Sequence, residues 1–185
     1  MPRWCRGVAR KLDQPPRQFK RPQRTLPCKT NITSLICETL HINLGKRLVK
    51  APKVYVRDSG IVHALLSIET HDELAGHPVV GASWEGFVIE NLLATAPPRS
   101  VASFYRTAAG AEIDLVLDVP KRGRWAIEIK RGLTPRLEKG FHVACDDLKP
   151  DRRFVVYSGS ERYALGPGLE AIGVRALAEM LAGGT

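Results

Sequence analysis

Two stretches decide the fold, Ala111-Glu112-Ile113-Asp114-Leu115-Val116-Leu117 and Arg124-Trp125-Ala126-Ile127-Glu128-Ile129-Lys130. Apolar and polar residues alternate along both of them. This period of two is typical of β-strands, in which successive side chains point to opposite faces of a sheet. The residues that join the stretches, 120–123, are few enough for a hairpin. The sequence therefore predicts two adjacent antiparallel strands.

The alternation also predicts where the charged side chains of these strands lie. On the second strand Glu128 and Lys130 share a face, while on the first strand Asp114 lies on the face opposite Ile113, Leu115 and Leu117. Two carboxylates beside an ammonium group can hold a divalent cation and help to prepare a water molecule for attack on a phosphate. The alternative is a pair of ordinary half-buried strands whose polar face is solvated or crossed by ion pairs.

The surrounding pattern predicts an α/β fold with a mixed central sheet. Apolar periodicity and turn residues place helices at 61–67, 83–94, 135–148 and 174–181, and strands at 53–56, 101–106, 112–118, 124–130 and 153–158. We expect a loop at 71–81 and a turn or two of helix within Ile32–Leu40. The core order is helix, three strands, helix and strand, that is α-β-β-β-α-β, with helices flanking the sheet.

The helix at 83–94 carries a further candidate residue. Trp84, Phe87, Val88 and Leu92 form its apolar stripe, and Glu85 lies just beside that stripe. A core-facing helix in this position can lean the Glu85 carboxylate toward the strands. The alternative is a boundary glutamate whose carboxylate extends to water.

Charged residues are unevenly distributed along the chain. The net charge is +9, from 28 basic and 19 acidic residues, but residues 1–53 contain 13 Lys and Arg and only 2 Asp and Glu. Residues 1–42 are also rich in proline and arginine, and we expect them to be disordered or loosely structured and 43–185 to form the folded domain. The basic segment suggests nucleic-acid binding, or merely a solvated charged arm. If it binds RNA or DNA, deletion of residues 1–41 is expected to abolish binding.

Cysteine and hydropathy patterns predict a cytoplasmic protein without a zinc site. Cys5, Cys28, Cys37 and Cys145 show no C-x-x-C spacing, so reduced thiols are expected. No apolar run reaches the roughly 20 residues of a membrane helix, and no secretory signal is visible at the start.

The order of the charged residues resembles that of the PD-(D/E)XK nuclease superfamily, which has a restriction-endonuclease-like fold. The matching residues are Glu85 on the helix, Asp114 on one strand, and Glu128 and Lys130 on the next. More narrowly, the chain is similar to the C-terminal domain of unknown function of prokaryotic AAA-type ATP-binding proteins. This similarity rests on Asn43–Tyr55 with Asp58-Ser59-Gly60, on Trp84–Val88, on Gly110–Leu115 and on Ala126–Lys130.

The resemblance implies a metal-dependent nuclease site. Asp114 and Glu128, with the Ile129 carbonyl, are expected to ligate Mg²⁺ or Mn²⁺, Glu85 a metal-bound water or a second metal, and Lys130 to orient the water or stabilise negative charge. Arg106 is expected to face the same cleft. DNA is expected to contact Lys121, Arg122, Arg124, Arg131 and Arg136; the alternative for these five is a solvated basic rim.

The resemblance also implies a partner. Members of such families begin with an ATPase module, whereas Gly45-Lys46-Arg47 lacks the first glycine and the Ser/Thr of a phosphate-binding loop, so ATP binding is not expected here. Residues 1–41 resemble nothing in the family, and we expect a truncated or frame-disrupted gene whose first segment is not native. The alternative to a nuclease is an inactive, nuclease-like interaction module that partners an ATPase or another protein.

Overall fold

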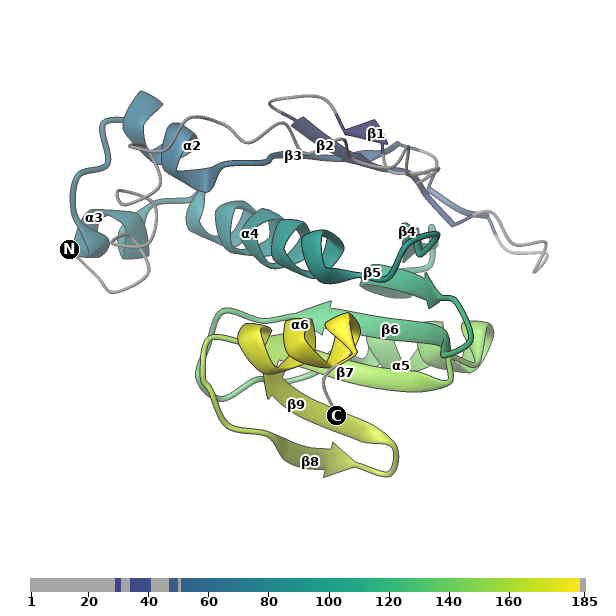
Figure 1. Cartoon of the computed structure of the whole chain (residues 1–185). Helices are drawn as coiled ribbons and strands as arrows, with labels where there is room; N and C mark the ends of the chain where they lie inside the picture. The colour runs from purple at the N-terminus through teal and green to yellow at the C-terminus, as the bar shows by residue number, and fades with distance from the viewer. Residues whose placement is uncertain (1–28, 31–33, 41–46, 50, 184–185) are drawn as a thin grey trace.

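The computed structural model describes residues 29–30, 34–40, 47–49 and 51–183. Its elements are shown in Figure 1 and follow the order β1 (Lys29–Thr30), β2 (Ser34–Cys37), β3 (Lys53–Val56), α2 (Ser59–Leu65), α3 (His71–Gly76), α4 (Val80–Thr95), β4 (Val101–Arg106), β5 (Glu112–Val119), β6 (Gly123–Ile129), α5 (Lys139–Leu148), β7 (Arg152–Tyr157), β8 (Tyr163–Gly166), β9 (Leu169–Gly173) and α6 (Val174–Ala182). The predicted order of helix, three strands, helix and strand is present as α4-β4-β5-β6-α5-β7.

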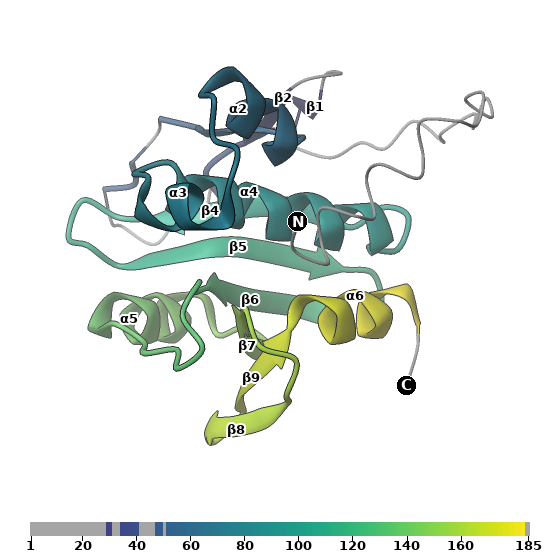
Figure 2. The ribbon, with the colours of Figure 1, turned by 90° about the vertical axis from the view of Figure 1, so that its left-hand side faces the viewer.

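A mixed six-stranded sheet forms the centre of the molecule. The strand order is β4-β5-β6-β7-β9-β8. Neighbours from β4 to β6 and the pair β8/β9 are antiparallel, whereas β6, β7 and β9 are parallel. The hairpin predicted between the two alternating stretches is present, with Val119 opposite Gly123. Figure 2 shows β5 running the length of the molecule beside α4. The structure thus confirms the predicted mixed α/β architecture.

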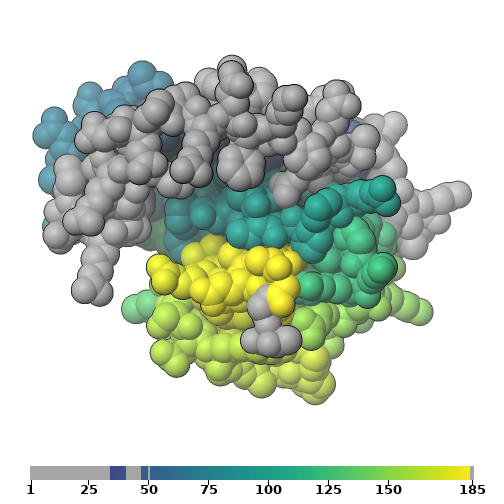
Figure 3. All heavy atoms as spheres, viewed as in Figure 1, coloured from purple at the N-terminus to yellow at the C-terminus, as the bar shows by residue number. Residues whose placement is uncertain are grey.

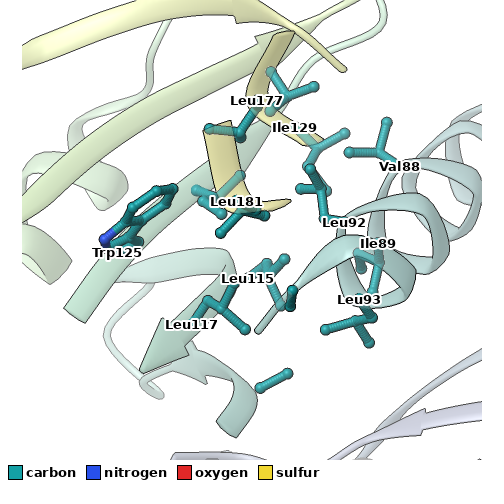
Figure 4. Close-up of a cluster of buried hydrophobic side chains, with 14 of the residues drawn as sticks. Val88, Ile89, Leu92, Leu93, Leu115, Leu117, Trp125, Ile129, Leu177 and Leu181 are labelled. Atoms are coloured by element: carbon teal, nitrogen blue, oxygen red, sulfur yellow. The ribbon is translucent and has the colours of Figure 1, made fainter. Parts of the chain in front are cut away.

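Both faces of the sheet are covered by helices, so both carry apolar side chains. On one face α4 and α6 contribute two i, i+4 pairs, Val88 with Leu92 and Leu177 with Leu181, to a buried cluster with Trp125 (Figure 4). On the other face α5 packs Phe141, Ala144, Cys145 and Leu148 against the strands. Burial on both faces explains why β4 reads as an almost continuous apolar run rather than a clean alternation.

The helix α4 differs in detail from its prediction. It starts at Val80 rather than Ser83, and its fully buried side chains are Val88, Ile89, Leu92 and Leu93. Trp84 and Phe87, which were predicted to lie on the stripe, are only partly buried. The reason is that α4 packs against the sheet on one side, beside α6 (Figure 3), and against β3 on another. A helix with neighbours on several sides has a broad apolar surface instead of one stripe.

Residues 34–40 belong to the folded core, which corrects two predictions. The prediction of a helix within Ile32–Leu40 is wrong for the described residues. Ser34–Cys37 form the strand β2, which pairs antiparallel with β3. Leu35 and Cys37 are fully buried. The predicted start of the folded domain at residue 43 is therefore too late for these residues. Most of the segment 1–42 lies outside the described residues. A deletion that tests nucleic-acid binding by the basic arm must end before β1, since removal of 1–41 would delete β2.

Three further boundaries depart from the predictions. Residues 71–81 are not a loop, since they contain α3 and the start of α4; a capping box between Thr70 and Glu73 begins α3. The hairpin β8/β9 was not predicted. The strand β8 is short and mostly exposed, so its sequence carries no alternation of apolar and polar residues. The helix α5 begins at Lys139, four residues later than predicted. No helix in the described residues is long and apolar enough to cross a membrane.

The glycine at the start of α5 gives a test of the packing between this helix and the sheet. A Cβ at Gly140 would lie 2.4 Å from the carbonyl oxygen of Gly110, in the turn between β4 and β5. Gly140→Ala is expected to destabilise the protein by about 1–3 kcal/mol, because backbone on both sides must move. Urea unfolding would measure the change.

Gly81 offers the matched control for this substitution. Like Gly140 it is the second residue of its helix, but nothing lies within 4 Å of a Cβ placed there. Gly81→Ala is expected to leave the free energy of unfolding unchanged or to raise it by up to about 1 kcal/mol. Equal effects of the two substitutions would contradict the described contact between α5 and the β4–β5 turn.

Candidate active site

Asp114 lies at an irregularity in the pairing of β5 with β4, just beyond the end of the ladder between β5 and β6. The register of β5 with β4 shifts between Ser103 and Tyr105, and its ladder with β6 ends at the pair Leu115 and Ile127. Beyond that pair, the backbone N–H of Ile129 donates to Asp114 Oδ2 at 3.0 Å. A side-chain oxygen thus accepts the hydrogen bond of a strand N–H. Such bulges re-aim side chains near functional sites.

The bulge also changes the face on which Ile113 lies. Ile113 packs in the cluster below α5, whereas Leu115 and Leu117 pack in the cluster below α4 and α6. The predicted shared face of Ile113, Leu115 and Leu117 is therefore wrong at Ile113. Strict alternation fails because the irregularity adds a residue to one strand between regular pairs. With Ile113 on the α5 side, Glu112 and Asp114 point toward β3 and α4.

The ammonium group of Lys53, on β3, joins three carboxylates. Its Nζ lies 2.9 Å from Glu85 Oε1, 2.9 Å from Asp114 Oδ1 and 3.0 Å from Glu112 Oε1. The Lys53 side chain is only 12% exposed. Burial opposes its charge, but the neighbouring Asp114 and Glu85 outweigh burial and raise the pKa of Lys53 above its ordinary value. Lys53 is therefore a permanently charged centre of this acidic group.

Glu85 and Glu112 each have a second partner. The Tyr55 hydroxyl donates to Glu85 Oε1, and the Arg106 guanidinium donates to Glu112 Oε1. Burial alone would raise the pKa of Glu112, but Arg106 and Lys53 lower it below its ordinary value. Tyr55 approaches α4 closely at Gly86, where a Cβ would meet the Tyr55 Cβ at 3.2 Å. A small residue after Glu85 thus lets β3 lie against α4.

Glu128 is buried on the α5 side of β6, in a position unlike that of the other carboxylates. It is 7% exposed, and its Oε1 lies 2.9 Å from Lys130 Nζ. Its Oε2 is buried and has no hydrogen-bond partner among the described residues. Burial, and next the charge of Asp114, raise the pKa of Glu128 to about 7 even though Lys130 lowers it. A buried carboxyl oxygen normally has a proton donor or a cation as its partner, so this atom calls for an explanation.

Comparison with known proteins places the chain in a family. Residues 80–177 match the family described as "Domain of unknown function (DUF4143)", over more than half of the chain. The chain belongs to the DUF4143 family. The matched range runs from the start of α4 into α6, so it contains Glu85, Arg106, Glu112, Asp114, Glu128 and Lys130.

The similar curated proteins are much longer than this DUF4143 chain. Uncharacterized proteins of Mycobacterium bovis and of Mycobacterium tuberculosis are each 39% identical to it over 130 residues. The aligned residues make up 70% of this chain and 29% of each relative, so the chain spans less than a third of their length. No solved structure matches the chain significantly.

Within the DUF4143 domain, the four residues predicted as catalytic lie around one end of the β5–β6 pair. Asp114 interacts with Glu128 electrostatically, Glu128 with Lys130 directly, and Glu85 with Asp114 through Lys53. Arg106 also faces this group: its hydrogen bond to Glu112 raises its pKa, and the charges of Asp114 and Glu85 add to the effect. The indole N–H of Trp84 donates to the Lys130 carbonyl at 3.2 Å, which ties α4 to the end of β6.

The five residues predicted to contact DNA do not form one surface. Arg131 directly follows Lys130, Arg136 lies five residues further on, and both are exposed. Lys121, Arg122 and Arg124 lie at the hairpin, four or more residues along β5 from Asp114, which is roughly 13 Å or more away. Arg122 donates to the carbonyls of Met180 and Leu181, and Arg124 forms a two-point ion pair with Asp118. These three therefore lie outside the acidic site.

The donor set fits a divalent cation only in part. Among the described residues, no group of three His, Cys, Asp or Glu side chains is arranged to hold a metal ion. Lys53 engages Glu85, Glu112 and Asp114 Oδ1. The Ile129 N–H engages Asp114 Oδ2, so the one buried carboxyl oxygen of this group in the described residues without a partner is Oε2 of Glu128. Carboxylate oxygens are the ligands that Mg²⁺ and Mn²⁺ prefer, and Mg²⁺ is commonly bound by one or two carboxylates with several waters. The chemistry of Glu128 Oε2, a carboxyl oxygen with an electrostatic neighbour in Asp114, thus suits one hydrated cation.

Sequence reasoning missed Lys53, Tyr55 and the pairing role of Glu112. A signal for the first two was present, because alternation along the strand Lys53-Val54-Tyr55-Val56 places Lys53 and Tyr55 on one face. What sequence lacked was the location of β3 against α4. That placement follows from packing between segments about 30 residues apart, as in the contact between Tyr55 and Glu85.

Proposed function

We propose that this DUF4143 domain hydrolyses phosphodiester bonds of DNA with one divalent cation, Mg²⁺ or Mn²⁺, held by Asp114, Glu128 and the Ile129 carbonyl. The observation that carries the proposal is the buried, partnerless Oε2 of Glu128 beside Asp114 and Lys130. The order of α4, β4, β5, β6, α5 and β7, with Glu85, Asp114, Glu128 and Lys130 on it, also agrees with a restriction-endonuclease-like fold.

In this proposal each side chain has a distinct task. When bound, the cation supplies charge neutralisation at the phosphate and a lowered pKa of a coordinated water. Lys130 holds a positive charge 2.9 Å from Glu128, where it orients a water or stabilises negative charge on the phosphate oxygens. Asp114 is fixed by the Ile129 N–H and by Lys53, so that its carboxylate is oriented before any cation binds. Arg131 and Arg136 contact the DNA backbone.

A nicking assay tests the proposal. The full chain should convert supercoiled plasmid DNA to the open circle in Mn²⁺ or Mg²⁺ and not in EDTA. Glu128→Gln should reduce this activity by at least about 100-fold, since it removes a charged ligand but keeps the side-chain size. Glu161→Gln, at an exposed glutamate in the loop before β8, is the matched control and should cleave like wild type. Equal activity of Glu128→Gln and wild type would identify a contaminating nuclease.

A second function is favoured by a different observation. Large apolar side chains are exposed on β3, on α2 and at the residue after α2: Val54, Val56, Ile61, Leu65 and Leu66. Together with the near-neutral charge of residues 54–185, these exposed side chains favour an inactive interaction module that partners an ATPase or another protein. Absence of Mn²⁺ binding in calorimetry, with a folded chain, would favour this module over the nuclease.

A further inference from the structure

The Lys53 ammonium has the surroundings of a bound cation rather than those of a surface ion pair. An ammonium group has three N–H donors, and three carboxylate oxygens lie 2.9–3.0 Å from Nζ, one each from Glu85, Asp114 and Glu112. The three carboxylates come from two separate elements, α4 and β5, and the ammonium comes from a third, β3. Lys53 also lies over the Phe104 ring, 5.7 Å from its centroid.

The formal charges of the neighbouring side chains indicate what the site would bind without the Lys53 ammonium group. Glu85, Glu112 and Asp114 carry three negative charges, and Arg106, bound to Glu112, carries one positive charge. Without Lys53 the group would have a formal charge of −2, which matches one divalent cation. The neighbouring carboxylate Glu128, 93% buried, adds an oxygen that has no partner among the described residues. This oxygen is thus an acceptor beside the acidic group that no described donor satisfies.

We propose that Lys53 is a tethered cation that occupies the position of a second divalent ion between Glu85 and Asp114, so that the domain binds one divalent cation per chain instead of two. The one cation that remains in this inference is the cation of the proposed function, at Asp114 and Glu128. The role of Lys53 does not depend on the proposed function. It assigns Glu85 to Lys53 and Tyr55, as a residue that positions the ammonium, rather than to a metal.

The test is the stoichiometry of Mn²⁺ binding, measured by calorimetry on the full chain, with free Mn²⁺ counted by electron paramagnetic resonance. Wild type should bind one Mn²⁺ per chain. Lys53→Gln should bind two, because the substitution removes the positive charge that neutralises Glu85, Asp114 and Glu112. Lys53→Arg keeps the charge and should still bind one. Lys50→Gln, at a lysine three residues before Lys53 in the sequence, controls for loss of a lysine charge.

The outcomes separate this inference from the proposed function. If wild type and Lys53→Gln each bind one Mn²⁺, Lys53 does not replace a second cation, and the nuclease proposal stands. The same holds if wild type binds two Mn²⁺. No ion in wild type but one in Lys53→Gln supports the tethered cation and removes the nuclease proposal. No ion in either protein overturns both.

The substitution also needs a safeguard, because an uncompensated acidic group can unfold the chain. The double variant Lys53→Met with Glu112→Gln removes one charge of each sign and keeps Glu85 and Asp114. It should bind one Mn²⁺ more than the single variant Glu112→Gln does. Thermal unfolding gives an independent measurement: Mn²⁺ should raise the melting temperature of the double variant more than that of wild type. Equal stoichiometry and equal stabilisation would overturn the proposal.

Discussion

Asp114→Asn is expected to reduce Mn²⁺-dependent DNA cleavage by at least about 100-fold and to weaken Mn²⁺ binding by at least about 10-fold. Asp114 occupies the central position of the site. It contacts Lys53 at Oδ1, the Ile129 N–H at Oδ2, and electrostatically Glu128. Asparagine keeps the size and one acceptor oxygen but removes the negative charge that a divalent cation needs. Plasmid nicking and calorimetry on the purified full chain would measure the two effects.

Asp118→Asn is the matched control for this prediction. Asp118 lies on the same strand, is paired with Arg124 at 2.7 Å, and sits at the hairpin end away from the carboxylates. Loss of this partly exposed ion pair is expected to leave cleavage unchanged and to affect stability by no more than about 1 kcal/mol. If Asp114→Asn and Asp118→Asn cleaved at the same rate, Asp114 would have no role in the reaction.

The elements predicted correctly from sequence are those whose own apolar periodicity matches the way they pack in the structure. Strands β4 to β7 and the helices α4 and α6 have strong periodicity or long apolar runs, and their cores were located within a few residues. The elements that were missed are determined by other features, namely a helix cap or a partner strand. The helix α3 depends on a capping box at Thr70 and Glu73, which was present in the sequence and was overlooked. The strand β2 depends on its partner β3, without which Leu35 and Cys37 give no clear period.

The site was predictable to the extent that it follows strand alternation and family resemblance. Glu128 and Lys130 share a face of β6, and their ion pair is the simplest consequence of that geometry. The position of Asp114 was not predictable by alternation, because the irregularity in β5 moves Ile113 to the other face and directs Asp114 toward β3 and α4. Lys53 lies 61 positions before Asp114 in the chain, so only the packed structure shows that they meet.

Glu128→Gln is expected to stabilise the cation-free protein at pH 8, although most substitutions of a buried residue destabilise. The folded state raises the pKa of Glu128 from 4.5 to about 7, through burial first and the charge of Asp114 second. The folded protein therefore holds a proton that the unfolded chain releases between those two pH values. In this window wild-type stability falls as the pH rises, by up to about 3 kcal/mol, and above it the loss is complete. Glutamine remains neutral throughout.

Urea unfolding in EDTA at pH 4.5 and pH 8 would measure this difference. Glu128→Gln and wild type should have similar stability at pH 4.5, and the variant should be more stable at pH 8. Glu112→Gln is the opposite control, because Arg106 and Lys53 lower the pKa of Glu112 and its removal should destabilise at pH 8. Mn²⁺ should stabilise wild type and not Glu128→Gln, because only the wild-type carboxylate gains a charged partner. A Glu128→Gln variant that is less stable than wild type at pH 8 without metal would show that Lys130 already compensates the buried charge.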